Sequence, residues 1–525
     1  MSKALKRKMA EAETYDEWKD AAQNYDERNG LQRWKQSKRS RLYDYAAIQG
    51  RLDSLKEMRL ENDSQGLLFH LNEGIHGNLG GMGRSALYRK AAFGTKQQIV
   101  DYVEEVSSAL EYLADPKLKS ISLKEKIDFF HRAHLCFGQS ALMFSGSGTF
   151  LFFHVGVLKA LWEQDLIPDV ISGASGGALI AAVAGSRKRD ELGEMFAPEF
   201  LQFEDEIKNI IRNLSPGKKR KLRKNDLMSI IERIIPDITF EEAYQISGLK
   251  INISIAPHEH HQKSRLLNAI TSPNVMLREA VLASCCIPGV FPPVSLAARD
   301  VKGQRVPYLP QRKWVDGSLS DDLPMKRLSR LYGVNHSIVS QTNPLVLPFL
   351  QAEKSDNGLM TTVSNTALKT MKDWGLAAST IMQKPFKESS YAGKLINGYI
   401  SVVSQTYTGN INILPSSRFL SPAEILASRT PAEVMELVND GERATWPQIE
   451  RIRVQTHISR ALNRLVNELD ESVVNGSRRA AHPKRKTTKR LSKQLSVVKE
   501  GAAKSKTTKK KTAKKKTITT NKKAS

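Results

Sequence analysis

The chain has 525 residues, 40% of them hydrophobic and 26% charged, and its formal net charge is +25. That length allows one large core plus appended segments, because single cores stop growing beyond about 250 to 300 residues. Three cysteines, two of them adjacent, exclude a secreted disulfide scaffold and favour an intracellular, reducing compartment. The basic N-terminus leads into Glu11, Glu13 and Asp16 rather than an apolar segment, so we expect no signal peptide.

The first 138 residues are expected to form a helical domain. Trp18, Trp34, Tyr43 and Tyr45 are interleaved there with lysines and arginines. Such segments suit a membrane interface, but aromatic side chains at helical spacing more often belong to a core. Both interpretations stay open at this point, and the core interpretation is preferred.

Residues 141–162 are typical of a buried strand, a glycine loop and an apolar helix. The loop contains Gly146, Ser147 and Gly148, and a helix that begins after such a loop offers backbone N–H groups to an anion. The anion can be a nucleotide phosphate or the oxyanion of an ester-cleavage intermediate. No lysine follows in the register of a phosphate-binding loop, which favours the oxyanion. The segment is long enough to span a membrane, but a polar loop at its centre argues against that.

A second strand, turn and helix are expected around Ser175, which lies between Gly173 and Gly177 at the end of an apolar run. This pattern is typical of a nucleophile elbow, a strained turn that exposes one hydroxyl. A side chain at either glycine is expected to collide with its neighbours. Because a lone G-x-S-x-G pattern also occurs by chance, an ordinary glycine-rich turn stays open.

Asp316 is the candidate base, since it ends a short apolar strand and is followed by glycine. A serine hydroxyl is a weak nucleophile until an acceptor takes its proton, so a histidine or a carboxylate must lie within reach. The histidines are poor candidates. His154 lies in the glycine-loop helix, His336 opens an apolar run, and His457 falls in an amphipathic helix.

The cluster at residues 258–261, with three histidines and a glutamate, suggests a metal site. Adjacent residues on one segment rarely converge on one ion, however, so we expect a solvated loop. Neither a metal nor an organic cofactor is expected.

The glycine loop, the serine elbow and the Asp-Gly pair, in this order, resemble the patatin-like phospholipases. Members of that family are acyl hydrolases that use a Ser-Asp dyad without histidine. Residues 283–293 resemble the family segment that helps to form the wall of the active site. The resemblance extends to the branch that contains fungal and plant triacylglycerol lipases and bacterial relatives, and covers roughly residues 10 to 350. The segments that carry this extension are residues 15–19, 76–80, 322–325 and 339–344.

The resemblance implies a three-layer α/β hydrolase domain over residues 139–345. It also implies hydrolysis of long-chain acyl esters of glycerolipids, either triacylglycerol or phospholipid. In that reading Ser175 is the nucleophile, Asp316 is the base, and the N–H groups of residues 146–148 form the oxyanion hole.

Two departures from the family pattern lie in the glycine loop, where Ser147 and Leu151 replace glycines. The Cβ of Ser147 can crowd the acyl carbonyl, and Leu151 requires a smaller neighbour. A catalytically impaired scaffold that binds membrane or nucleic acid is therefore the alternative.

Helices are expected over residues 346–476. Residues 421–424 and 430–433 both have the sequence of a capping box, with a hydroxyl at the N-cap and glutamate three residues later. Apolar side chains then recur at helical spacing, which indicates a helix packed on its own core, with a lipid-binding stripe as the alternative. These side chains are Ile452, Ile458, Leu462, Leu465 and Leu469.

Residues 477–525 form a basic tail with 19 lysines and arginines and one acid, Glu500, so the tail carries +18 of the net charge. Few apolar residues are present, and disorder is expected. A polyanion is the expected partner, either anionic lipid head groups at a membrane or lipid-droplet surface or a nucleic acid, and a tail without a partner stays open. The expected location is cytoplasmic with peripheral lipid association.

Overall fold

The computed structural model describes residues 2–201, 224–259, 263–288, 290–343, 346–347, 408–416 and 429–481. The capping box expected at 421–424 and the tail from residue 482 onward lie outside the described residues. The described residues up to 466 form one compact unit, and the described residues from 467 onward belong to a second. The expected division at residue 345 needs correction, because residues 411–413, inside the expected helical extension, form a strand of the same sheet as residues 334–340. The other domain boundaries stay predictions.

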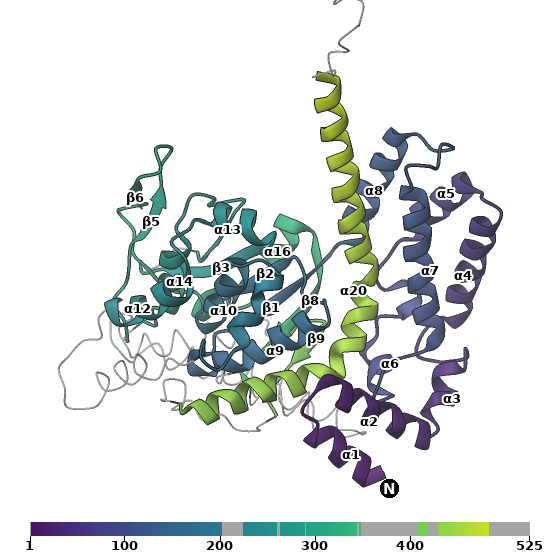
Figure 1. Ribbon diagram of the computed structural model, residues 1–525, viewed down its shortest axis with the longest axis horizontal. Coiled ribbons are helices and arrows are strands. Elements are labelled where there is room, and N and C mark those ends of the chain that lie inside the picture. The colour runs from purple at the N-terminus through teal and green to yellow at the C-terminus, as the bar shows by residue number, and fades with distance from the viewer. Residues whose placement is uncertain are drawn as a thin grey trace, which may run out of the picture. The chain divides into compact units, whose positions relative to one another are not determined.

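The N-terminal region is helical, as expected (Figure 1). The aromatic side chains of Trp18 and Tyr43 are buried, which supports the core interpretation. The last helix begins with a capping box of Ser122 and Glu125 and ends at Gly138, which has a φ of +79°. The elements are α1 (Ser2–Glu11), α2 (Tyr15–Arg28), α3 (Leu31–Gln36), α4 (Tyr45–Leu60), α5 (Ser64–Gly74), η1 (Leu79–Gly81), α6 (Ser85–Arg89), α7 (Gln97–Ala114) and α8 (Leu123–Phe137).

In the described part of the chain, seven strands then form a mixed sheet in the order β4-β3-β2-β1-β8-β9, with β7 paired to β3. Strands β3, β2, β1, β8 and β9 are parallel, whereas β4 and β7 run antiparallel to β3. A separate hairpin is formed by β5 and β6. The strands are β1 (Gln139–Phe144), β2 (Val170–Gly173), β3 (Lys250–Pro257), β4 (Arg265–Asn268), β5 (Leu296–Arg299), β6 (Arg305–Tyr308), β7 (Trp314–Asp316), β8 (Val334–Ser340) and β9 (Ile411–Ile413).

Both faces of the sheet are covered, because the side chains of β1 point alternately to one face and the other and are buried on both. Leu142 and Phe144 belong to the large core on one face, together with α9, α10 and α14. Ala141 and Met143 point to the other face and pack near α16. Successive side chains of a strand face opposite sides, so a central strand buried on both faces is apolar throughout. The expected three-layer α/β architecture is confirmed.

The remaining helices of the described residues include those that cover the sheet, among them α9, α10 and α14 (Figure 1). They are η2 (Gly148–Phe150), α9 (Leu151–Glu163), α10 (Gly176–Gly185), η3 (Asp190–Phe196), α12 (Lys224–Ile234), α13 (Phe240–Ser247), α14 (Leu277–Cys285), α15 (Ser318–Asp321), α16 (Met325–Tyr332) and α20 (Pro431–Ala481).

Helix α20 begins with the expected capping box. The Glu433 carboxylate accepts from Thr430 N–H at 2.7 Å, and Glu433 N–H donates to Thr430 Oγ1 at 3.3 Å. The helix crosses α9 closely, because a Cβ on Gly156 would lie 1.9 Å from the carbonyl oxygen of Val438. Within the first compact unit its apolar positions are buried, which confirms packing on the protein's own core.

Candidate active site

Ser175 occupies the turn between β2 and α10. Its φ is 53° and its ψ is −124°, a backbone conformation that is strained for a residue with a side chain. A Cβ on Gly173 would lie 2.2 Å from the carbonyl oxygen of Gly177, and a Cβ on Gly177 would lie 2.5 Å from that of Phe144. Both glycines are therefore needed for the chain to make this turn, as the sequence pattern indicates.

Asp316 lies at the end of β7, beside the elbow. Its Oδ1 accepts from Ser318 N–H at 2.8 Å, and only 2% of the residue is exposed. Burial raises the pKa of Asp316 to about 6, while hydrogen bonds from Ser318 and from the Ser175 side chain oppose that shift. The structure thus brings together the candidate nucleophile and the candidate base.

The end of α14 connects these two residues. Ser284 Oγ accepts from Ser175 N–H at 2.9 Å and donates to the carbonyl oxygen of Ser254 on β3 at 2.7 Å. Two residues later, the carbonyl oxygen of Cys286 accepts from Asp316 N–H at 2.9 Å. Ser284 and Cys286 therefore hold the backbones of both candidates.

The backbone N–H groups of Ser147, Gly148 and Gly176 have no hydrogen-bond partner among the described residues. They lie at the starts of η2 and α10, where a helix leaves N–H groups unpaired. The inclusion of Gly146 among the oxyanion donors needs correction, because its N–H donates to Asp322 Oδ1 at 2.7 Å. Gly176, which the sequence analysis did not single out, is a third candidate donor.

The two residues that depart from the family pattern, Ser147 and Leu151, both lie next to Gly176. A Cβ on Gly176 would lie 2.2 Å from Ser147 Oγ and 3.2 Å from Leu151 Cβ. The smaller neighbour that Leu151 was expected to need is therefore Gly176. The Ser147 hydroxyl donates only a long hydrogen bond, of 3.5 Å, to the carbonyl oxygen of Gly148.

His154 is buried beneath the glycine loop rather than beside Ser175. Its Nε2 lies 3.1 Å from the carbonyl oxygen of Ser145 and 3.1 Å from Thr342 Oγ1, and its Nδ1 lies 2.7 Å from Ser340 Oγ. Burial lowers the pKa of His154 to about 3, so the ring is neutral. His154 therefore supports the loop from below.

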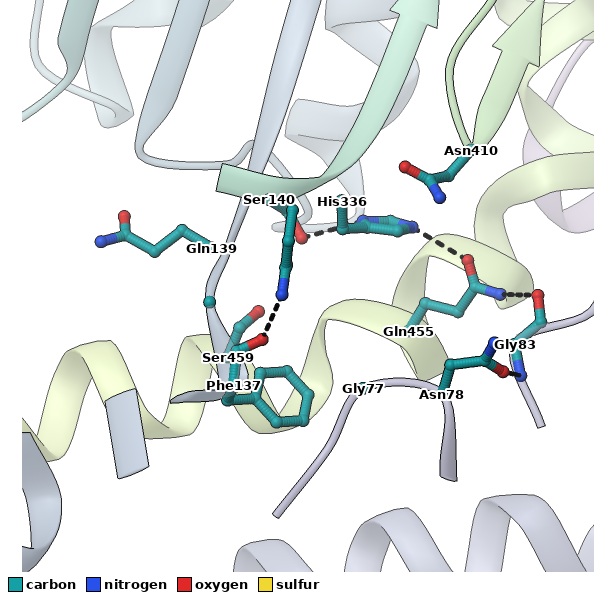
Figure 2. Close-up of a pocket in the computed structure, with 12 residues that line it drawn as sticks. Gly77, Asn78, Gly83, Phe137, Gln139, Ser140, His336, Asn410, Gln455 and Ser459 are labelled. Atoms are coloured by element: carbon teal, nitrogen blue, oxygen red, sulfur yellow. Dashed lines mark hydrogen bonds between the residues drawn. The ribbon is translucent and has the colours of Figure 1, made fainter. Parts of the chain in front are cut away.

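His336 lies at the opposite edge of the sheet, in a cavity of about 170 Å³ (Figure 2). Its Nδ1 lies 2.9 Å from Ser140 Oγ and its Nε2 lies 3.0 Å from Gln455 Oε1. Burial lowers the pKa of His336 to about 4. His457 lies on α20. The structure does not bring either histidine to the elbow.

Residues 260 and 261 of the histidine cluster lie outside the described residues. Within the described ranges, no group of three or more His, Cys, Asp or Glu side chains is arranged to hold a metal ion. In the same ranges, no helix is both long and apolar enough to cross a membrane.

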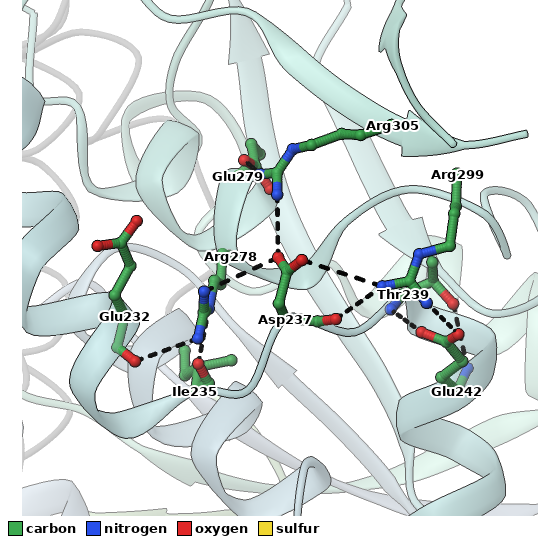
Figure 3. Close-up of polar contacts among 9 residues, drawn as sticks. All are labelled: Glu232, Ile235, Asp237, Thr239, Glu242, Arg278, Glu279, Arg299 and Arg305. Carbon is green, nitrogen blue, oxygen red and sulfur yellow. Dashed lines mark hydrogen bonds and ion pairs between the residues drawn. The ribbon is translucent and has the colours of Figure 1, made fainter. Parts of the chain in front are cut away.

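An ion network fixes the elements beside α14 (Figure 3). Asp237 pairs with Arg278 of α14 and with two arginines of the β5–β6 hairpin, Arg299 and Arg305. Arg305 also pairs with Glu279 of α14. Beside this network lies a groove of about 490 Å³ whose apolar lining is Met228, Leu282, Pro293, Val294, Leu296, Val306 and Pro307.

Two family models match the chain. Residues 1–135 match a domain of unknown function, DUF3336, and residues 142–328 match the patatin-like phospholipase model. Triacylglycerol lipase ptl3 of Schizosaccharomyces pombe is 32% identical over 480 residues, which cover 88% of this chain and 98% of that lipase. Triacylglycerol lipase 4 of Saccharomyces cerevisiae is 34% identical, over 84% of this chain and 50% of that lipase.

Among solved structures, VipD from Legionella pneumophila matches 57% of this chain and 67% of its own, with 14% identity and a TM-score of 0.23. That score is too low to support any detail of the site. The relationship rests on sequence, from the N-terminal domain through the elbow to the segment after Asp316. The chain belongs to the patatin-like phospholipase family, in the branch that carries the additional N-terminal domain.

Proposed function

We propose that this protein hydrolyses long-chain acyl esters of glycerolipids, with Ser175 as nucleophile and Asp316 as base. The observation that carries the proposal is the strained turn at Ser175, which presents its hydroxyl to a buried carboxylate, next to backbone N–H groups that have no partner among the described residues. Strain, burial and a raised pKa at one place are typical of a catalytic centre.

In the first step Ser175 Oγ attacks the ester carbonyl carbon and Asp316 accepts the hydroxyl proton. The negative charge on the carbonyl oxygen is stabilised by the N–H groups of Ser147, Gly148 and Gly176. The intermediate collapses, and Asp316 returns the proton to the leaving alcohol. Water, deprotonated by Asp316, then attacks the acyl carbon. The bond to Ser175 Oγ breaks, Asp316 returns the proton to Ser175 Oγ, and the fatty acid leaves. A base with a pKa near 6 is suited to both proton transfers near neutral pH.

Triacylglycerol is the substrate that we place first. Both yeast relatives are named triacylglycerol lipases, and the apolar groove beside α14 suits an acyl chain. The lysine that lines it, Lys313, also suits a phosphate, so a phospholipid is the second candidate. We further propose that the basic tail binds electrostatically to an anionic lipid surface.

The test is hydrolysis of triolein, diolein and phosphatidylcholine by the purified full-length chain, with a fluorophosphonate probe as a substrate-independent readout. We expect labelling at Ser175 and fastest release of oleate from triolein. Wild-type protein that folds but neither labels nor releases oleate would favour the non-catalytic scaffold.

A further inference from the structure

Asp322 is a fully buried carboxylate just after α15, six residues beyond the candidate base. Its Oδ1 accepts from Gly146 N–H at 2.7 Å, and its Oδ2 accepts from Asn343 Nδ2 at 3.3 Å. Neither the elbow nor the Asp-Gly pattern assigns a role to this residue. A buried carboxylate is costly unless it is hydrogen-bonded, so the contacts at this position matter for the fold and for the loop.

The contact to Gly146 connects two segments of the site. Gly146 opens the glycine loop, and a Cβ on it would lie 2.8 Å from Ser318 Cβ, so the loop packs directly on the segment that follows Asp316. A short hydrogen bond from a backbone N–H to a carboxylate is among the stronger kinds in proteins. It fixes the plane of the Ser145–Gly146 peptide, which precedes the peptide that carries Ser147 N–H.

The other anchors of the loop lie on the strand side. Ser145 N–H donates to the carbonyl oxygen of Ser340 at 3.1 Å, and Thr342 N–H donates to Ser145 Oγ at 2.9 Å. His154 Nε2 also lies 3.1 Å from the carbonyl oxygen of Ser145, so His154 and Asp322 hold opposite sides of the Ser145–Gly146 peptide. Asp322 supplies the anchor on the glycine side.

We propose that Asp322 is a positioning residue, whose bond to Gly146 N–H orients the glycine loop so that Ser147 N–H and Gly148 N–H face the acyl carbonyl oxygen. This inference rests on the proposed hydrolysis at Ser175. Asp322 acts through the loop and touches no reacting atom.

The role requires a hydrogen-bond acceptor at position 322 and does not require a charge. Asp322→Asn retains an oxygen that can accept from Gly146 N–H, whereas Asp322→Leu has a similar volume and leaves that N–H unpaired. Asp321→Asn is the matched control, because Asp321 pairs with Arg327 at 3.2 Å on the neighbouring helix.

Each full-length variant is compared with wild type for triolein hydrolysis and for the rate of fluorophosphonate labelling, after a thermal melt has shown that it is folded. For Asp322→Leu we expect kcat and the labelling rate to fall roughly 100-fold with little change in KM, which is the loss typical of one misplaced oxyanion donor. Asp322→Asn should stay within about tenfold of wild type, and Asp321→Asn should match it. If the leucine variant does not fold, Asp322→Ala and Asp322→Ser take its place.

Two results would overturn the inference: a folded leucine variant with wild-type kcat, or an asparagine variant as impaired as the leucine variant. If the proposed hydrolysis itself is wrong, the result is different, because the wild-type protein would then neither be labelled at Ser175 nor hydrolyse triolein.

Discussion

The polar groups at the two edges of the sheet, where its parallel strands begin and end, differ in strain and in hydrogen-bond pairing. At the carboxyl edge, Ser175 is strained, three backbone N–H groups are unpaired within the described residues, and Asp316 and Asp322 are buried with raised pKa values. At the amino edge, both ring nitrogens of His336 have partners. Costly arrangements persist in proteins where chemistry requires them, so the comparison points to the carboxyl edge as the functional one.

The largest expected effect comes from Ser175→Ala. Removal of a nucleophile typically costs several orders of magnitude in kcat, so we expect a loss of about 10⁴-fold or more with the melting temperature preserved. The measurement is initial-rate hydrolysis of triolein. Ser172→Ala is the control, since Ser172 lies on β2 just before the turn, buried, with a hydroxyl that has no partner among the described residues. Retention of more than a few per cent of turnover in Ser175→Ala contradicts the assignment.

Asp316→Asn should be nearly as damaging to turnover, because an amide cannot accept the serine proton. The same change should stabilise the fold at pH 8. Burial raises the pKa of Asp316 to about 6 in the folded chain, above its value when unfolded, so ionisation destabilises the folded state as pH rises through 6. The gain is on the order of 1 to 3 kcal/mol in the free energy of unfolding, measured by urea denaturation. Lower stability in the variant at pH 8 would refute this account.

The pH profile of wild-type kcat/KM tests the same base without a mutation. Asp316 must be ionised to accept a proton, so activity should fall as pH decreases below about 6. Burial also raises the pKa of Asp322 to about 7, and the charge of Asp316 adds to that shift. The acidic limb therefore reports on both carboxylates together rather than on either one. Activity that stays constant down to pH 4 is inconsistent with a carboxylate base of raised pKa.

The local features of the carboxyl edge could be predicted from sequence, because each is a property of a few consecutive residues. The turn at Ser175 requires the glycines that lie two residues before and after the serine. The strand that ends at Asp316 is followed directly by a glycine. Ser284 and Asp322 could not be predicted in the same way. Their partners lie 109 and 176 residues away in the chain, so their roles depend on tertiary packing. For the same reason, the sequence pattern alone includes Gly146 among the oxyanion donors, since its partner Asp322 is distant in the chain.

Two histidines, one near each edge of the sheet, test the functional difference between the edges directly. His154→Ala removes the support of the Ser145 carbonyl, so we expect kcat to fall about tenfold, whereas His336→Ala should leave kcat unchanged. Both changes should lower the melting temperature, since each leaves buried polar partners unpaired. Equal losses of kcat in the two variants would mean that the edges are not functionally distinct. A complete loss in His154→Ala with the fold intact would indicate a catalytic histidine.

Ser147→Gly should raise kcat slightly, by up to about tenfold, or leave it unchanged. The serine side chain lies against Gly176 beside the candidate oxyanion donors, and its hydroxyl makes only a long hydrogen bond. Glycine would remove a group that can crowd the acyl carbonyl. The measurement is kcat on triolein and on a short-chain ester. A large decrease would show that the serine hydroxyl itself contributes to the oxyanion hole.

The smallest effect on turnover is expected from deletion of residues 477–525, which hold +18 of the +25 net charge but none of the proposed catalytic residues. Hydrolysis of detergent-dispersed triolein should be unchanged. Binding to anionic vesicles should weaken, because each lysine or arginine near an anionic surface contributes about 1 kcal/mol within a Debye length of about 8 Å. Vesicle sedimentation at low and high salt measures this, with neutral vesicles as the control. Unchanged vesicle binding together with lost retention on duplex DNA would assign the tail to nucleic acid, and the attraction to lipid would then have to come from the folded part of the chain.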